Sequence, residues 1–140
     1  MEILDQNLFM IHELTAITEK LATEIVDIAI KIHKKLGPGL LESVYEKCFC
    51  YELQKRGIPF VKQKHVEIIY DDLIIDDGLR IDVLVGEQIV VEFKAQQNPH
   101  EVWNAQVLSY LKLTNKELGF LINFHVRLMK NGIKRVICTQ

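Results

Sequence analysis

Two carboxylates and a lysine lie close together in a segment that is otherwise apolar. Asp82 is followed, after a turn, by Glu92 and Lys94 in a run of mostly Val, Ile and Phe. Ionised side chains on a half-buried strand cost free energy unless they are paired or bind a metal. Two carboxylates can hold a hard divalent cation, with a lysine beside the water that the cation activates. These residues therefore indicate a metal-dependent hydrolytic site.

The apolar residues on either side of this site predict how the two strands pair. A three-residue loop at 86–88, which begins with a glycine, allows a hairpin whose apolar sets share one face. The same register puts Asp82 opposite Glu92 on the other face, with about 5 Å between Cβ atoms. Lys94 is two residues from Glu92 and lies on that face as well. The predicted pairs are Val85 with Ile89, Val83 with Val91, and Ile81 with Phe93.

A simpler explanation stays open at this point. Charged residues on a strand often form a solvated outer face with a weak ion pair. Leu84 and Val90 share the face of Asp82 and Glu92, so we expect that face to be partly covered.

Length and composition describe an ordinary globular protein. The chain has 140 residues, of which 49% are hydrophobic and 26% charged, and we expect one domain over residues 1–140. Three cysteines without zinc-site spacing predict reduced thiols. The net charge of −2 argues against a protein whose main role is to bind a phosphate backbone. It does not exclude a nuclease, because acidic metal ligands lower the net charge themselves.

We expect a cytoplasmic protein that does not enter a membrane. The first residues lack the basic start of a signal peptide, and no apolar run approaches the length of a bilayer span.

Hydrophobic periodicity predicts an α/β domain with a mixed β-sheet flanked by helices. Thr18 is the expected cap of the first helix, and Asn131-Gly132 predicts a type I′ hairpin between strands 126–129 and 133–137. The predicted helices span 18–36, 41–56 and 98–112, and the other strands span 60–70, 81–85, 89–93 and 119–124.

The motif set resembles that of the PD-(D/E)xK nuclease superfamily. The superfamily pattern is an aspartate followed by Asp/Glu-x-Lys on the neighbouring strand, here Asp82, Glu92 and Lys94. Downstream, Gln106 and Tyr110 resemble the Gln-x-x-x-Tyr motif of the RecB-like and phage-exonuclease-like branch.

A second motif narrows the resemblance. Gly39, Glu42 and Tyr45 form Gly-x-x-Glu-x-x-Tyr, which resembles the small family called GxxExxY proteins. The resemblance covers about residues 20–137, so that residues 1–17 would be an N-terminal extension of a single nuclease-like domain.

The resemblance implies a restriction-endonuclease-like core that acts on nucleic acid, with DNA favoured over RNA. Glu42 would join Asp82 and Glu92 around Mg²⁺ or Mn²⁺, and Lys94 would orient or deprotonate the attacking water. Gln106 and Tyr110 would position the substrate strand or Lys94. The implied catalytic residues are Glu42, Asp82, Glu92, Lys94, Gln106 and Tyr110.

Each supporting residue also has a structural explanation. Glu42 lies in the first turn of a helix, where a carboxylate favours the helix dipole. Gln106 and Tyr110 are four residues apart and could simply pack at the edge of the core. Trp103 stands where relatives often carry a histidine, and packing is the favoured role, with stacking on a base as the alternative. His33 fits a helix end better than a ligand role.

Two other functions remain open. A nuclease fold could be reused as a non-catalytic module that binds nucleic acid or protein, and the acidic pI of about 6.2 favours this alternative. The chain could also work as a homodimer, or with a protein partner as a subunit of a larger complex.

Overall fold

The computed structural model describes the backbone of residues 2–138 and the side chains of residues 16–138. The described helices are α1 (Glu2–Leu36), α2 (Glu42–Lys55), α3 (Val102–Thr114) and the 3-10 helix η1 (Met129–Asn131). The strands are β1 (Phe60–Tyr70), β2 (Leu73–Val85), β3 (Ile89–Lys94), β4 (Leu118–Asn123) and β5 (Ile133–Ile137). They form one sheet in the order β1-β2-β3-β4-β5, with β3 and β4 parallel and the other neighbours antiparallel. The predicted mixed sheet flanked by helices is confirmed.

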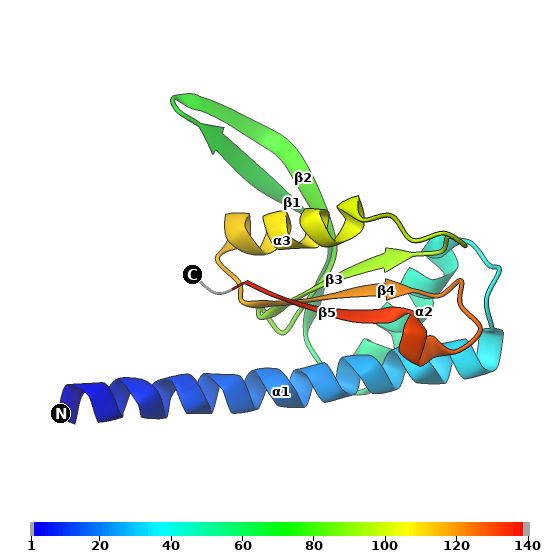
Figure 1. Ribbon diagram of the computed structural model, residues 1–140, viewed down its shortest axis with the longest axis horizontal. Coiled ribbons are helices and arrows are strands. Elements are labelled where there is room, and N and C mark those ends of the chain that lie inside the picture. Colours follow the sequence, from blue (N-terminus) through cyan, green and yellow to red (C-terminus); the bar gives the residue numbers. More distant parts are fainter. Residues whose placement is uncertain (1, 139–140) are drawn as a thin grey trace.

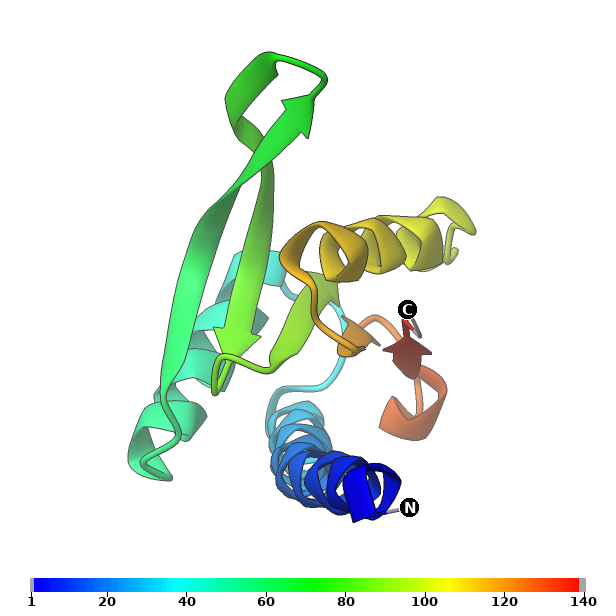
Figure 2. The same ribbon diagram turned by 90° about the vertical axis from the view of Figure 1, so that its left-hand side faces the viewer.

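The sheet separates two hydrophobic cores. Helices α1 and α2 cover one face, and α3 covers the other (Figures 1 and 2). On the α1 side, Phe93 of β3 packs edge-on against Phe49 of α2, with ring centroids 5.1 Å apart. On the α3 side, Leu84, Val90 and Leu121 meet α3. Alternate residues of the central strand therefore enter different cores.

Helix α3 connects the two parallel strands and lies very close to the sheet. Strands β3 and β4 with α3 between them form a βαβ unit. At Gly119 of β4, an added Cβ would stand 2.7 Å from Val107 Cγ1 and 3.3 Å from Val90 O. Only glycine allows this approach, which brings the side chains of α3 down onto the central strand.

The predicted hairpin register is confirmed for two of the three named pairs and is wrong at its outer end. Val83 pairs with Val91, and Val85 with Ile89, as expected. Pairing ends there, and Ile81 belongs to the α3-side core instead of facing Phe93. Strand β2 leaves β3 at this point and continues with β1 into a projecting hairpin, and Gln63 of β1 has a positive φ of 52° there.

The predicted start of two helices is wrong. Helix α1 begins at Glu2, so Thr18 is no cap, and its hydroxyl donates to Gln88 Oε1 at 2.7 Å. Helix α3 begins at Val102 instead of residue 98, and the Trp103 N–H bonds to His100 O in its first turn. The expected extension at residues 1–17 stays a prediction, because the side chains of residues 1–15 lie outside the described residues.

The predicted type I′ hairpin at Asn131-Gly132 is also wrong. Such a turn needs positive φ at both central residues, but Gly132 has φ −99° and follows η1. Strand β5 pairs with β4 instead, and Gly132 O accepts a hydrogen bond from Asn123 N at 2.8 Å. The glycine serves close approach, since an added Cβ would stand 2.1 Å from Asn123 O.

Tyr45 holds the turn between α1 and α2. Its ring is fully buried and stacks on Phe124 with centroids 4.2 Å apart. Its hydroxyl donates to Gly37 O at 2.6 Å and accepts from Leu40 N at 3.1 Å. The turn that precedes Glu42 is therefore anchored to the core.

Two composition-based expectations can be compared with the structure. The three cysteines are free thiols, with Cys50 and Cys138 buried and Cys48 partly exposed. Among the described residues, no helix combines the length and apolar character that crossing a membrane requires.

Replacing Gly132 with alanine tests the close approach. The added methyl group meets the Asn123 carbonyl, so we expect Gly132→Ala to destabilise the protein by about 1–3 kcal/mol. Thermal unfolding measures this as a lower Tm. The matched control Asn131→Ala changes an exposed neighbour and should leave Tm nearly unchanged. A Gly132→Ala protein as stable as wild type would contradict the described packing.

Candidate functional site

Strand β3 presents Glu92 and Lys94 toward α3 from the middle of the sheet. Its neighbouring side chains, Val91 and Phe93, enter the opposite core. The parallel partner strand β4 places Leu121 beside Glu92. Glu92 is 5% exposed, so the carboxyl lies inside the protein.

Asp82 reaches the same place from β2. Its Oδ2 accepts a hydrogen bond from the Phe93 N–H at 3.0 Å. Backbone pairing between β2 and β3 ends at Val83–Val91. Beyond this point the Asp82 carboxylate, instead of a backbone carbonyl of β2, accepts the hydrogen bond from β3. The side chain is thereby held against the backbone of β3, next to Glu92.

Three side chains surround the Lys94 ammonium. Its Nζ donates to Gln106 Oε1 at 3.3 Å, lies 3.8 Å from Glu92 Oε2, and stands 5.5 Å from the centroid of the Trp103 ring. The Lys94 side chain is 15% exposed. Trp103, for which the sequence favours packing, is buried in the α3 core and also contacts the lysine.

The surroundings of the Glu92 carboxyl disfavour its charged form. Burial, together with the nearby Asp82, raises its pKa to about 9, and Lys94 opposes the shift. Its Oε1 is buried and has no hydrogen-bond partner among the described residues. The carboxyl therefore either keeps its proton near neutral pH or needs more positive charge than Lys94 provides.

Helix α3 adds two predicted residues to this cluster. Gln106 contacts Lys94, and Tyr110, 6% exposed, lies one turn further along. Burial raises the pKa of Tyr110 to about 12, with the charges of Glu92 and Asp82 acting in the same direction. The phenol is therefore neutral near pH 7 and can donate a hydrogen bond.

Helix α2 contributes two carboxylates at the rim. Partial burial and the charge of Asp82 raise the pKa of Glu42, while Lys94 lowers it. Burial and Asp82 also raise the pKa of Glu46, which accepts from Gln63 Nε2 at 2.6 Å. Sequence reasoning missed Glu46. Its spacing of four from Glu42, on one helix face, was the available signal.

The predicted three-carboxylate metal shell is not preformed. No group of three or more His, Cys, Asp or Glu side chains within the described residues is arranged to hold a metal ion. The donor set nevertheless fits a divalent cation at Asp82 and Glu92. Glu92 Oε1 lacks a partner, and the pKa values of Glu42, Glu46 and Glu92 are all raised. A bound cation would give Glu92 Oε1 a partner. Its positive charge would also lower the pKa values of these carboxyls.

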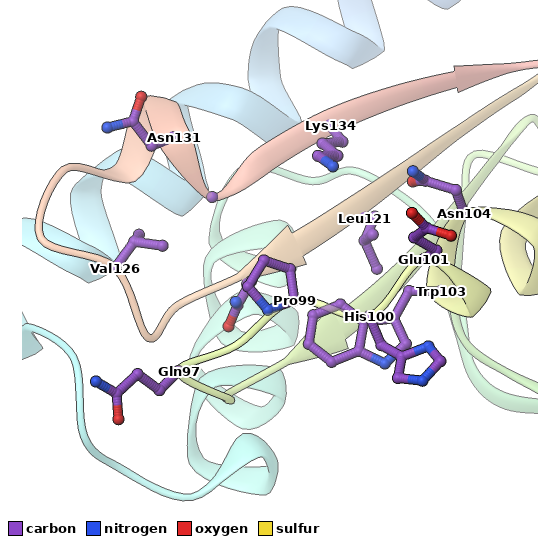
Figure 3. Close-up of a pocket in the computed structure, with 12 residues that line it drawn as sticks. Gln97, Pro99, His100, Glu101, Trp103, Asn104, Leu121, Val126, Asn131 and Lys134 are labelled. Atoms are coloured by element: carbon purple, nitrogen blue, oxygen red, sulfur yellow. The ribbon is translucent and has the colours of Figure 1, made fainter.

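A pocket of about 260 Å³ adjoins the cluster and shares Trp103 with it (Figure 3). The loop before α3 forms one wall, and this loop is tied to β4 by Asn123, whose amide donates to Gln96 O at 2.8 Å and accepts from Gln96 N at 3.2 Å. Sequence reasoning gave Asn123 no role in holding this loop. The polar side chains of the pocket include Gln97, Asn104, Asn131 and Lys134.

Comparison with known proteins gives one positive result. The model of a family described as the PD-(D/E)XK nuclease superfamily matches residues 19–136. The mixed sheet with flanking helices agrees with the restriction-endonuclease-like fold expected for such a chain. No curated protein and no solved structure matches.

The raised pKa of Glu92 predicts how stability changes with pH in metal-free buffer. The unfolded chain loses this proton near 4.5 and the folded protein near 9, so stability falls as pH rises between these values. We expect Glu92→Gln to unfold at a higher Tm than wild type at pH 8.5, and the difference to shrink toward pH 5.

Calorimetric or fluorescence melts across this range measure the effect. Glu117→Gln, at an exposed site, is the matched control and should follow the wild-type profile. Parallel pH profiles for wild type and Glu92→Gln would show that Glu92 is not the buried, strained carboxyl described above.

Proposed function

The chain belongs to the PD-(D/E)XK nuclease superfamily, and we propose that it is a divalent-metal-dependent nuclease that hydrolyses phosphodiester bonds. One observation carries the proposal: the buried Glu92 and the partly buried Lys94 lie on the same face of the central strand, with Asp82 held next to them by the Phe93 N–H. A structural ion pair would require neither the second carboxylate nor the unpartnered Glu92 oxygen.

We assign Asp82 and Glu92 to hold Mg²⁺ or Mn²⁺, with Glu42 approaching from the rim of α2. When bound, such an ion polarises the scissile phosphate and lowers the pKa of a bound water. The two β-strand carboxylates would fix its position because both are attached to a rigid sheet. Glu42 begins α2 at an anchored turn and would adjust more freely.

Lys94 would stabilise the negative charge that develops on the phosphate. A cation that is already in place costs no reorganisation when the reaction occurs. Gln106 and Trp103 contact the Lys94 ammonium beside Glu92, so they act as positioning residues. Tyr110, neutral near pH 7, would donate a hydrogen bond to the substrate or to a carboxylate.

The substrate we propose is nucleic acid, with DNA preferred. The pocket beside Trp103 would accept a nucleotide next to the cleaved bond, since it combines an aromatic ring, amide side chains and one lysine, Lys134. We also propose that the chain is a GxxExxY protein. The support is that Tyr45 anchors the turn from which Glu42 starts α2.

A second candidate is a binding module without catalysis. The observation that favours it is the lack of a ready group of three ligands among the described residues. Such a module would bind nucleic acid or protein and would gain nothing from Mg²⁺ or Mn²⁺.

A nuclease assay with Mn²⁺ or Mg²⁺ separates the two candidates. We expect wild type to cleave labelled single- or double-stranded DNA, and Asp82→Asn and Lys94→Ala each to lose about 10²-fold or more in rate. Lys112→Ala, on an exposed part of α3, is the matched control and should cleave normally. RNA substrates are tested in parallel.

Titration calorimetry with Mn²⁺ completes the design. Wild type should bind the ion, and Asp82→Asn should bind it far more weakly. Equal cleavage by all four proteins, or binding of nucleic acid without cleavage or metal uptake, would remove the nuclease proposal.

A further inference from the structure

The end of the β1–β2 hairpin carries large apolar side chains that the rest of the protein does not cover. Ile69 and Tyr70 are 65% and 69% exposed, and Leu73 and Ile74 are each 58% exposed. Cross-strand pairing groups them two by two on opposite faces of the hairpin end, since Ile69 pairs with Ile74 and Tyr70 with Leu73. The hairpin projects beyond α3 in both views (Figures 1 and 2). Both faces of the hairpin end are therefore apolar and exposed, and exposed apolar surface of this kind marks an interaction surface. We call residues 69–75 the hairpin tip.

The hairpin tip is surrounded by negative charge. Residues 66–78 contain five acidic side chains and no lysine or arginine. The five are Glu67, Asp71, Asp72, Asp76 and Asp77. Asp77 is partnered by His65, and the other carboxylates have no ion-pair partner among the described residues. Such a surface repels a phosphate backbone, so its partner must be a protein surface that is apolar at its centre and basic around it.

The chain itself has a surface of that kind. A groove of about 310 Å³ lies between α1 and α2. Its apolar lining includes Leu36 and Tyr51, which are 40% and 60% exposed. Lysines surround it: Lys31, Lys35 and Lys47 line the groove, and Lys55 Nζ stands 5.5 Å from the centroid of the Tyr51 ring. We call this surface the lysine groove.

One carboxylate also lies in the lysine groove, and it is already neutralised. Glu52 Oε2 is 3.0 Å from Lys31 Nζ and forms an ion pair with it. The remaining lysines therefore give the groove a net positive charge. The hairpin tip points away from α2 and from the end of α1 in both views (Figures 1 and 2). A chain therefore does not fill its own groove.

We propose that the hairpin tip of one copy docks into the lysine groove of a second copy. The apolar side chains of the tip match the apolar lining, and the aspartates meet the lysines. The contact joins two different surfaces, so it can close as a reciprocal dimer or a ring. The proposal does not depend on nuclease activity, because neither surface includes the residues proposed for catalysis.

Sedimentation velocity over a concentration series tests the proposal on the full chain. Wild type should associate as concentration rises, and more weakly at high salt, because salt screens the aspartate–lysine attraction. A tip variant, Leu73→Ser with Ile74→Ser, should weaken association about tenfold or more. A groove variant, Lys35→Glu with Lys47→Glu, should do the same. Leu128→Ser, which changes an exposed apolar residue elsewhere, should associate like wild type.

Mixing the two variants gives the sharpest result. The tip variant keeps an intact groove and the groove variant keeps an intact tip, so their equimolar mixture should associate more strongly than either variant alone. Circular dichroism checks that both variants are folded. A wild type that stays monomeric would overturn the proposal. So would association that the variants leave unchanged, or a mixture that does not recover, as expected if the tip contacts another tip or a different protein.

Discussion

Burying the Glu92 carboxyl in the central strand costs free energy, and the neighbouring side chains determine how much of this cost is offset. An isolated ionised group in a protein interior loses several kcal/mol of solvation. Lys94 compensates part of this at 3.8 Å, but Asp82 adds a second negative charge, and Oε1 of Glu92 remains without a partner. A stable core would place valine here, as β3 does at the preceding position. The cost is understandable if the strand serves chemistry.

The fold makes this arrangement rigid by ordinary packing. The glycine at 119 lets α3 lie against the sheet, and α3 then places Gln106 and Trp103 around the lysine. Where β2 leaves β3, the Asp82 carboxylate takes the place of a backbone acceptor, so the side chain proposed as a metal ligand also bonds to the backbone of β3. Helix α2 is fixed less directly, through the Tyr45 turn, and its carboxylates stay at the rim.

Much of this could be predicted from sequence, because apolar alternation is a strong local signal. The pairing of Val83 with Val91 followed from burial alone, while Gln106, Tyr110 and the third ligand Glu42 came from family resemblance. The predictions were wrong where tertiary contacts, rather than the local sequence, determine the structure. Ile81 enters the other core because β2 turns away at Asp82, and Asn131-Gly132 forms no I′ turn because β5 pairs with β4. Glu46 escaped notice because a carboxylate one turn from another looks like a solvated helix residue.

The chain belongs to the PD-(D/E)XK nuclease superfamily, and its buried Glu92 carboxyl is charged near neutral pH only if a cation adds to the positive charge of Lys94. The central claim is that Asp82 and Glu92 together hold that cation. Anomalous diffraction from crystals soaked in Mn²⁺ tests it most directly. The account predicts a peak within about 2.5 Å of oxygen atoms from both carboxylates. Ordered Asp82 and Glu92 side chains with no peak between them, at Mn²⁺ concentrations that support cleavage, would contradict it.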